Sequence, residues 1–356
     1  MGLNEKFFKS ASGGGVPVGT DNFAPVLYVG NSPNSQSISS LNFKPDLVWM
    51  KNRDAGNSHA LVDSVRGRSK VIYSDASTAE ATSDSGRDLV SFNSNGFTVG
   101  QPQRANSTNK SGDDIVAWCW RANGAAVQNN DGTINGANCL VSANQASGFS
   151  IVNYSGSSAA GTVGHGLTST PELIIIKRRT TTNNWLALQS NEGVGGYLDL
   201  SNAMTTSNYN AWTNNTSPNS NVVSLAGLSF LTGSDMLMYC WHSVAGYQKV
   251  GSYLGNSSTT GRIIYTTDNG LVGGANGFRP RFLMVKSLGT GSWWMVDSVR
   301  STTNPRKNLL ASNENSQEIV GTGTNYFNFN ATSFQPTTTT AQINGNNVTY
   351  IYLAIA

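Results

Sequence analysis

The chain has 356 residues, enough for two or three folded units, and 38% of them are hydrophobic while only 12% are charged. A net charge of +3 without a basic stripe argues against a disordered polyelectrolyte and against nucleic-acid binding. No apolar run approaches the roughly 20 residues that cross a bilayer, so no membrane-spanning segment is predicted.

The first predicted element is an N-terminal arm, residues 1–22. It begins MGLNEKFFKS, which lacks the apolar run of a secretory signal. A run of three glycines follows, so we expect a flexible arm that ends in an apolar hook and serves for attachment. The attachment residues would be Leu3, Phe7 and Phe8. A disordered terminus is the alternative.

A first folded unit is predicted over residues 23–122. Its landmarks are PDLVWMK, ALVDSVR and the closing run IVAWCW. Short runs of β-branched and aromatic residues between Gly, Asn and Pro predict strands. An Asn-Gly pair at 95–96 predicts a hairpin over residues 89–99, because both turn positions tolerate positive φ.

Two further units follow. Residues 123–148 are rich in Asn, Gly and Ala and predict a long loop or linker. The second unit, 149–246, repeats the landmarks as PELIIIK, WLALQS and MLMYCW, but its counterpart of the 89–99 hairpin is poorly matched. The third unit, 247–356, repeats them as PRFLMVK, WWMVDSVR and YIYLAI. It carries an insertion of about ten residues around 263–274.

The landmarks recur three times in one order, which indicates three copies of one module. We therefore predict an all-β chain of three tandem β-sandwich domains, jelly-roll or lectin-like, each burying its own core. Only 243–249 separates the second and third units, so these are expected to pack rigidly.

Certain single residues recur or stand out. Lys51, Lys177 and Lys286 each follow a proline by six positions, which predicts a strand end with its ammonium in water. The three cysteines are predicted to be buried free thiols, because an odd and sparse set does not build a disulfide framework.

The segments FKPDLVWMKNR, ALVDSVRG, DIVAWCWRANG and GFRPRFLMVK resemble a repeat domain of virion structural proteins from tailed marine and freshwater bacteriophages, such as cyanophages and pelagiphages. The resemblance covers nearly the whole chain from Phe23 onward. It implies assembly into a virion in the host cytoplasm, contact with other virion proteins and with copies of the chain itself, and no catalytic residues.

Catalytic, metal and cofactor sites are not predicted. The histidines His59, His165 and His242 show no metal-ligand spacing and are expected to be structural. A hydrolase trio at His59 and Asp63-Ser64 is not retained in the third copy, so a turn or hydrogen-bond role for Asp-Ser is favoured. Solvated loop charges are expected at Asp84, Asp88, Asp113 and Asp114.

Aromatic residues in polar surroundings are the best binding candidates. Trp293 and Trp294 follow a Gly-rich turn, and neighbouring residues of a strand point to opposite faces, so one of the two is expected to reach solvent. Tyr209 and Trp212 lie in an Asn-, Ser- and Thr-rich segment that is expected to be a loop. Flat aromatic faces of this kind could stack on a host surface glycan, and core or interface packing is the alternative.

The sequence thus favours a non-enzymatic virion structural protein, a tail or appendage component. A capsid decoration protein is one alternative, and a polysaccharide-binding or polysaccharide-degrading β-sandwich protein is another.

Overall fold

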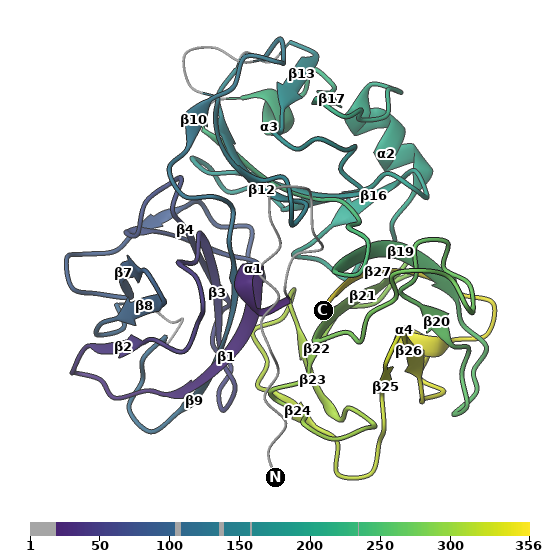
Figure 1. Ribbon diagram of the computed structural model, residues 1–356. Helices are drawn as coiled ribbons and strands as arrows, with labels where there is room; N and C mark the ends of the chain where they lie inside the picture. Colours follow the sequence, from purple (N-terminus) through teal and green to yellow (C-terminus); the bar gives the residue numbers. More distant parts are fainter. Residues whose placement is uncertain (1–18, 104–107, 135–138, 157–158, 234) are drawn as a thin grey trace, which may run out of the picture.

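A computed structural model of the chain describes residues 19–103, 108–134, 139–156, 159–233 and 235–356. Leu3, Phe7 and Phe8 lie outside the described residues. The remaining chain is built of antiparallel strands with a few short helices, which confirms the predicted all-β sandwich class (Figure 1). In the described residues, no helix has the length and apolarity needed to cross a bilayer.

Repeat 1, residues 23–122, consists of a six-stranded sheet and a three-stranded sheet, in the orders β1-β9-β3-β4-β5-β6 and β2-β8-β7. Helix α1, Gly19–Asn22, precedes it. The predicted Asn-Gly hairpin is confirmed as the pair β7 and β8. The strands are β1 Phe23–Val29, β2 Gln36–Ile38, β3 Leu47–Asn52, β4 Ala60–Asp63, β5 Lys70–Tyr73, β6 Ala81–Thr82, β7 Leu89–Asn93, β8 Gly96–Val99 and β9 Asp114–Trp120.

Repeat 2, residues 149–246, has a larger main sheet, β10-β11-β12-β18-β14-β15-β16, and a two-stranded outer sheet, β13-β17. The first two strands come from residues 123–148, which is therefore not simply the predicted loop. The alternating LVSAN segment forms β11 and pairs with β12, whose counterparts β1 and β19 are edge strands in repeats 1 and 3. The elements are β10 Val127–Gln128, β11 Leu140–Asn144, β12 Phe149–Tyr154, β13 Gly161–Gly164, β14 Leu173–Arg178, β15 Leu186–Gln189, β16 Val194–Tyr197, α2 Thr206–Thr213, β17 Val222–Leu225, α3 Ser229–Thr232 and β18 Met236–Trp241.

Repeat 3, residues 247–356, returns to the plan of repeat 1, with sheets β19-β27-β21-β22-β23-β24 and β20-β26-β25. The elements are β19 Gln248–Leu254, β20 Ile264–Tyr265, β21 Phe282–Ser287, β22 Trp293–Asp297, β23 Asn308–Ala311, β24 Ile319–Val320, β25 Phe327–Asn330, β26 Ser333–Pro336, α4 Ala341–Asn344 and β27 Thr349–Ile355.

The same strand register recurs in all three repeats. The first residue of the central strand lies opposite the end of the closing strand each time, as Leu47 opposite Trp120, Leu173 opposite Trp241 and Phe282 opposite Ile355. This register makes positions in the three repeats equivalent.

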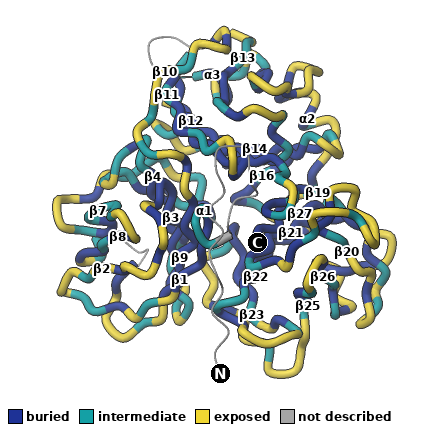
Figure 2. Tube along the Cα trace, in the orientation of Figure 1, coloured by how far each residue is buried: buried dark blue, intermediate teal, exposed yellow. Residues whose placement is uncertain are grey.

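The three main sheets surround a common apolar core at the centre of the molecule (Figures 1 and 2). Side chains alternate along each central strand, so Leu47 and Trp49 of β3 face this shared core while Val48 and Met50 face the core inside repeat 1. The expectation that each copy buries only its own core is thus incomplete, because a fourth core joins all three. The division into three domains stays a prediction.

Aromatic rings from the three repeats meet at the centre. The ring of Trp120 lies 6.3 Å from that of Trp241 and 5.9 Å from that of Phe282, measured between centroids. Full burial of a large apolar side chain contributes about 1.5–3 kcal/mol, so the shared core is a major source of stability. It also covers one face of β15, which is buried along its whole length.

Candidate functional site

The predicted binding aromatics are not on the surface. Trp293 is 2% exposed and lies in the shared core, where its Nε1 donates to the carbonyl oxygen of Tyr197 at 2.9 Å. Trp294 points to the opposite face and is 9% exposed, and its Nε1 donates to Gln342 Oε1 at 2.9 Å. The prediction that one of them reaches solvent is wrong, since both faces of this strand are covered.

Tyr209 and Trp212 lie on helix α2 and not in the expected loop. The hydroxyl of Thr205 accepts a hydrogen bond from the Asn208 backbone N–H and caps the helix, which ends at Asn214 in a left-handed conformation. The spacing of three residues places both rings on the same face of α2, and that face packs into the core of repeat 2. Their predicted exposure is therefore also wrong.

The recurring lysines are buried, and the prediction that their ammonium groups lie in water is wrong. Lys51 Nζ donates to the carbonyl oxygens of Asn52 and Ala55, at 2.6 and 3.1 Å. Lys177 Nζ reaches across to the carbonyl of Ser77 in repeat 1, at 2.9 Å.

Lys286 Nζ is bound like that of Lys51, by the carbonyls of Ser287 and Gly289 at 2.7 and 2.8 Å. Burial lowers the pKa of Lys51, Lys177 and Lys286 to about 8 in each case. Each lysine therefore binds a backbone carbonyl of the loop that follows its own central strand.

The first interface, between repeats 1 and 2, holds a buried network of charges. Arg66 Nε lies 2.5 Å from Asp63 Oδ2, and Arg66 Nη1 lies 2.9 Å from Glu80 Oε2. From repeat 2, Arg179 donates to both oxygens of Glu80 at 2.8 Å, and the Tyr239 hydroxyl donates to Asp63 at 2.9 Å. Burial alone would raise the pKa of Glu80, but the two arginines hold it below its usual value. The carboxylate is thus a structural anion.

The second interface, between repeats 3 and 1, repeats this network at equivalent positions. Arg300 Nε lies 2.6 Å from Asp297 Oδ2, and Arg300 Nη1 lies 2.8 Å from Glu318 Oε1. From repeat 1, Arg53 Nη2 lies 2.7 Å from Glu318 Oε2, and Trp118 Nε1 donates to Asp297 at 3.0 Å. The chain therefore closes into a ring, because its last repeat binds its first.

The third interface, between repeats 2 and 3, has none of these charged pairs among the described residues. The five equivalent positions hold Gln189, Glu192 and Met204 from repeat 2 and Leu288 and Leu353 from repeat 3. The backbone contact is nevertheless kept. The N–H of Met204 donates to the carbonyl of Leu288 at 2.9 Å, as that of Glu80 does to Arg179 and that of Glu318 to Arg53, both at 2.8 Å.

The remaining candidates for catalysis have structural partners. His59 Nδ1 accepts from Trp49 Nε1 at 3.0 Å, and burial lowers the pKa of His59 well below its usual value. Asp88, expected to be solvated, is buried and accepts hydrogen bonds from the Ser83 hydroxyl and the Gln103 N–H. The cysteines are free and buried as predicted. No group of three His, Cys, Asp or Glu side chains in the described part of the chain has the geometry of a metal site.

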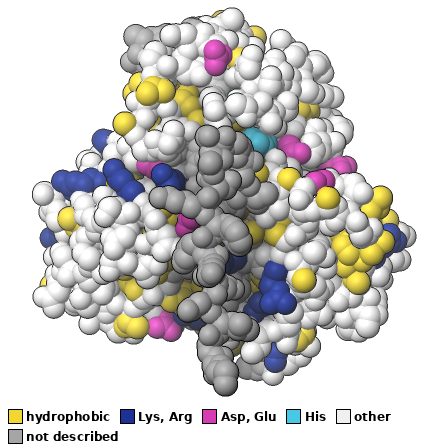
Figure 3. Space-filling model, in the orientation of Figure 1, with side chains coloured by type: hydrophobic (Ala, Val, Ile, Leu, Met, Phe, Trp, Pro, Cys, Tyr) yellow, Lys and Arg dark blue, Asp and Glu magenta, His cyan; other side chains and the backbone are white. Residues whose placement is uncertain are grey.

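The surface is largely uncharged, and on the face shown in Figure 3 the charged side chains are few and scattered. An exposed apolar tip lies on the predicted insertion of repeat 3, where Leu271 is 62% and Val272 is 76% exposed. The tip is held by hydrogen bonds, because Asn269 Oδ1 accepts from the Leu271 N–H at 3.0 Å and the Thr267 hydroxyl donates to the Leu271 carbonyl at 2.9 Å.

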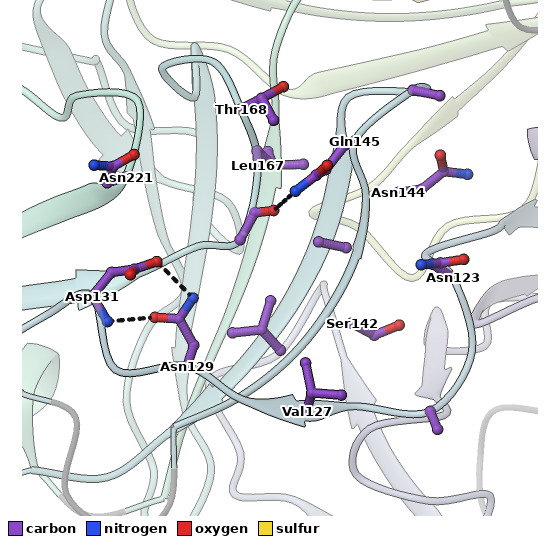
Figure 4. A pocket seen from close by; sticks show the side chains of 15 residues that line it. Asn123, Val127, Asn129, Asp131, Ser142, Asn144, Gln145, Leu167, Thr168 and Asn221 are labelled. Carbon is purple, nitrogen blue, oxygen red and sulfur yellow. Dashed lines mark hydrogen bonds between the residues drawn. The ribbon is translucent and has the colours of Figure 1, made fainter. Parts of the chain in front are cut away.

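A groove of about 850 Å³ lies beside β11 on repeat 2 (Figure 4). Its floor is apolar and its rim carries amides, a hydroxyl and one carboxylate. Sequence reasoning missed it, because its residues come from the segment taken for a linker and from two distant turns. The lining residues used below are Val127, Asn129, Asp131, Val141, Gln145, Leu167, Thr168 and Asn221.

Comparisons with known proteins gave a match to a family model and none to an individual protein. No curated protein matches the chain, and no solved structure matches it. One family model matches residues 18–356, and it spans all three repeats together with the segment that joins the first two. The chain therefore belongs to the family described as a domain of unknown function, DUF7483.

Proposed function

We propose that the chain is a non-enzymatic structural protein of a tailed bacteriophage particle, a tail or appendage component that assembles in the host cytoplasm. The resemblance of its strand motifs to virion repeat domains motivates the proposal. Support comes from the use of its buried charges. Glu80 and Glu318 are each bound by two arginines and tie the repeats together, so they are occupied as structural anions.

The observation that carries the proposal is the apolar tip Leu271–Val272. Two aliphatic side chains exposed to water do not stabilise an isolated protein. A contact in a particle would remove their apolar surface from water, which is favourable. The tip belongs to an insertion that the other two repeats lack, so it is separable from the ring. We propose that it contacts another virion protein.

The tip can be tested without disturbing the fold. The variant Leu271→Asp with Val272→Asp should remain folded but should fail to enter particles when it replaces the natural protein during infection. The matched control is Thr302→Asp with Thr303→Asp, which adds the same two charges at an exposed polar pair in the same repeat. Mass spectrometry of purified particles measures incorporation.

Incorporation of the tip variant at the level of the control would refute the docking role. Absence of the unmodified protein from purified particles would refute the virion proposal itself. The capsid decoration alternative predicts that labelled protein coats emptied heads and ignores host cells. The degrading-enzyme alternative predicts release of reducing ends from host polysaccharide.

A further inference from the structure

We propose that the groove beside β11 is a binding site for a neutral oligosaccharide. The site occurs only in repeat 2 of the described ring, because strands β10 and β11 cover an edge that has no counterpart strand in the main sheets of repeats 1 and 3. The inference goes beyond the structural role proposed above and does not depend on it, since a groove of this kind could bind sugar in any protein.

The floor of the groove suits the apolar face of a sugar ring. Val127, Val141 and Leu167 line it. Val127 is 66% exposed, while Val141 and Leu167 are buried, so Val127 presents most of the apolar surface. A pyranose has a face of C–H groups that packs against aliphatic side chains, which would shield Val127 from water. The volume of about 850 Å³ lies within the usual range for small-molecule sites, about 300–1,000 Å³, and admits more than one ring.

A fixed carboxylate stands on one side of the rim. Asn129 Nδ2 donates to Asp131 Oδ2 at 3.0 Å, and Asn129 Oδ1 accepts from the Asp131 backbone N–H at 3.0 Å, as Figure 4 shows. These two bonds fix the carboxylate. Among the described residues, none donates to its other oxygen Oδ1, which is thus free to accept from a sugar hydroxyl. Hydrogen bonds to a charged acceptor are stronger than neutral ones.

Uncharged polar groups stand on the rest of the rim. Gln145 Nε2 donates to the carbonyl of Gly166 at 3.1 Å, which orients the amide at the groove edge and leaves its Oε1 as an acceptor. Thr168 and Asn221 line the groove on the same rim and add a hydroxyl and an amide. Sugar hydroxyls both donate and accept, so they match this mixture.

The charge of the rim selects among ligands. Lysine and arginine do not occur among the residues that line the groove, and its single charge is negative. Phosphates, nucleic acids and acidic polysaccharides would meet a carboxylate with no compensating cation, which disfavours them. A peptide would use the edge strand β10, but this strand has only two residues. A neutral saccharide is the ligand class that remains.

The test uses the full chain and a panel of neutral and acidic oligosaccharides on an array, followed by calorimetric titration of the ligands that bind. We expect neutral members to bind, and we expect Asp131→Ala to weaken binding about 10- to 100-fold, the effect of losing one hydrogen bond to a charged group. Binding should change little between low and high salt, because the ligand is uncharged.

The matched control is Asp268→Ala, which removes the carboxylate of an equally exposed Asn–Asp pair in repeat 3, where Asn276 Nδ2 donates to Asp268 Oδ2 at 2.8 Å. It should leave saccharide binding unchanged. A second groove variant, Val127→Asp, changes an exposed side chain and should abolish binding without unfolding the protein. The inference fails if no neutral saccharide binds, if only acidic saccharides or peptides bind, or if both groove variants bind like the control.

Discussion

The first and third interfaces join their repeats through the same backbone hydrogen bond, yet their side chains differ at every position of the charge network. Asp63, Arg66 and Glu80 meet Arg179 and Tyr239 at the first interface. At the third interface the equivalent set is Gln189, Glu192, Met204, Leu288 and Leu353. The network is thus present or absent as a whole. This is expected, because a single buried charge without its partner destabilises the fold by more than a complete ion pair stabilises it.

The difference also fixes the order of the repeats in the ring. In the reverse cyclic order, the arginine of repeat 1, Arg53, would face Met204, and Leu288 would face Glu80. Glu80 would keep Arg66 and Arg53 would keep Asp114, but each would lose its charged partner from the neighbouring repeat, which disfavours the reverse order. The third interface, which lacks the network, therefore acts together with the two charged ones to specify a single closed arrangement.

Removing one charge from the network should have the largest effect. Arg66→Met leaves the buried Asp63 without its arginine and leaves Glu80 with Arg179 alone, and Arg300→Met does the same to Asp297 and Glu318. We expect each variant to lower the free energy of unfolding by about 3–5 kcal/mol. Glu192→Met changes the equivalent position of the third interface, where the Glu192 carboxylate accepts an exposed hydrogen bond from the Ser252 hydroxyl at 2.6 Å, and should cost under about 1 kcal/mol. Urea denaturation compares the three variants, and equal effects would contradict the comparison.

Removing two charged partners together should lower the free energy of unfolding by less than the sum of the two single substitutions. Glu80→Met leaves Arg66 and Arg179 facing each other, whereas Glu80→Met with Arg179→Leu gives the two residues found at the third interface. A double-mutant cycle should show a coupling of about 1–3 kcal/mol. The same cycle with Glu318→Met and Arg53→Leu at the second interface serves as an internal repeat. Additive effects at both interfaces would show that the charges do not act as a unit.

The buried lysines should give the smallest effect, and it should be alike in repeats 1 and 3. Their pKa is lowered to about 8 in the folded protein, while an unfolded lysine titrates near 10.4. Between pH 8 and about 10 the unfolded chain binds more protons, so the free energy of unfolding should rise with pH.

The contribution of one lysine is at most about 1.4 kcal/mol per pH unit. Lys51→Met and Lys286→Met should each flatten the rise between pH 8 and 9.5 by a similar amount, measured by urea denaturation at each pH. A slope unchanged in both variants would mean that these ammonium groups titrate as in water.

Much of the fold could be predicted from local sequence. The landmarks that begin at Pro45, Pro171 and Pro280 predicted the repeats and their strands, because β-branched runs and Asn-Gly turns depend on a few neighbouring residues. Helix α2 was missed since Tyr209 and Trp212 supply only one apolar spacing, although Thr205 is an ordinary helix cap.

The shared core could not be predicted in the same way. Whether Trp293 or Lys51 reaches water depends on what covers the second face of a main sheet, and the covering residues come from a different repeat. The groove beside β11 was missed for another reason, because its residues come from the segment taken for a linker and from two turns distant in the sequence. One signal was available: Asp63 and Arg66 recur as Asp297 and Arg300 with the same spacing, and recurrence of a charged pair inside an apolar landmark indicates a buried ion pair.

The central claim is that three repeats share one core and unfold as one ring. Hydrogen–deuterium exchange in increasing urea tests it most directly, with the strands β3, β14 and β21 as probes, one from each repeat. The account predicts that the slowest amides of all three strands exchange with the same free energy of opening and the same dependence on urea. Exchange of one of these strands at a distinctly lower free energy, while the other two stay protected, would contradict it.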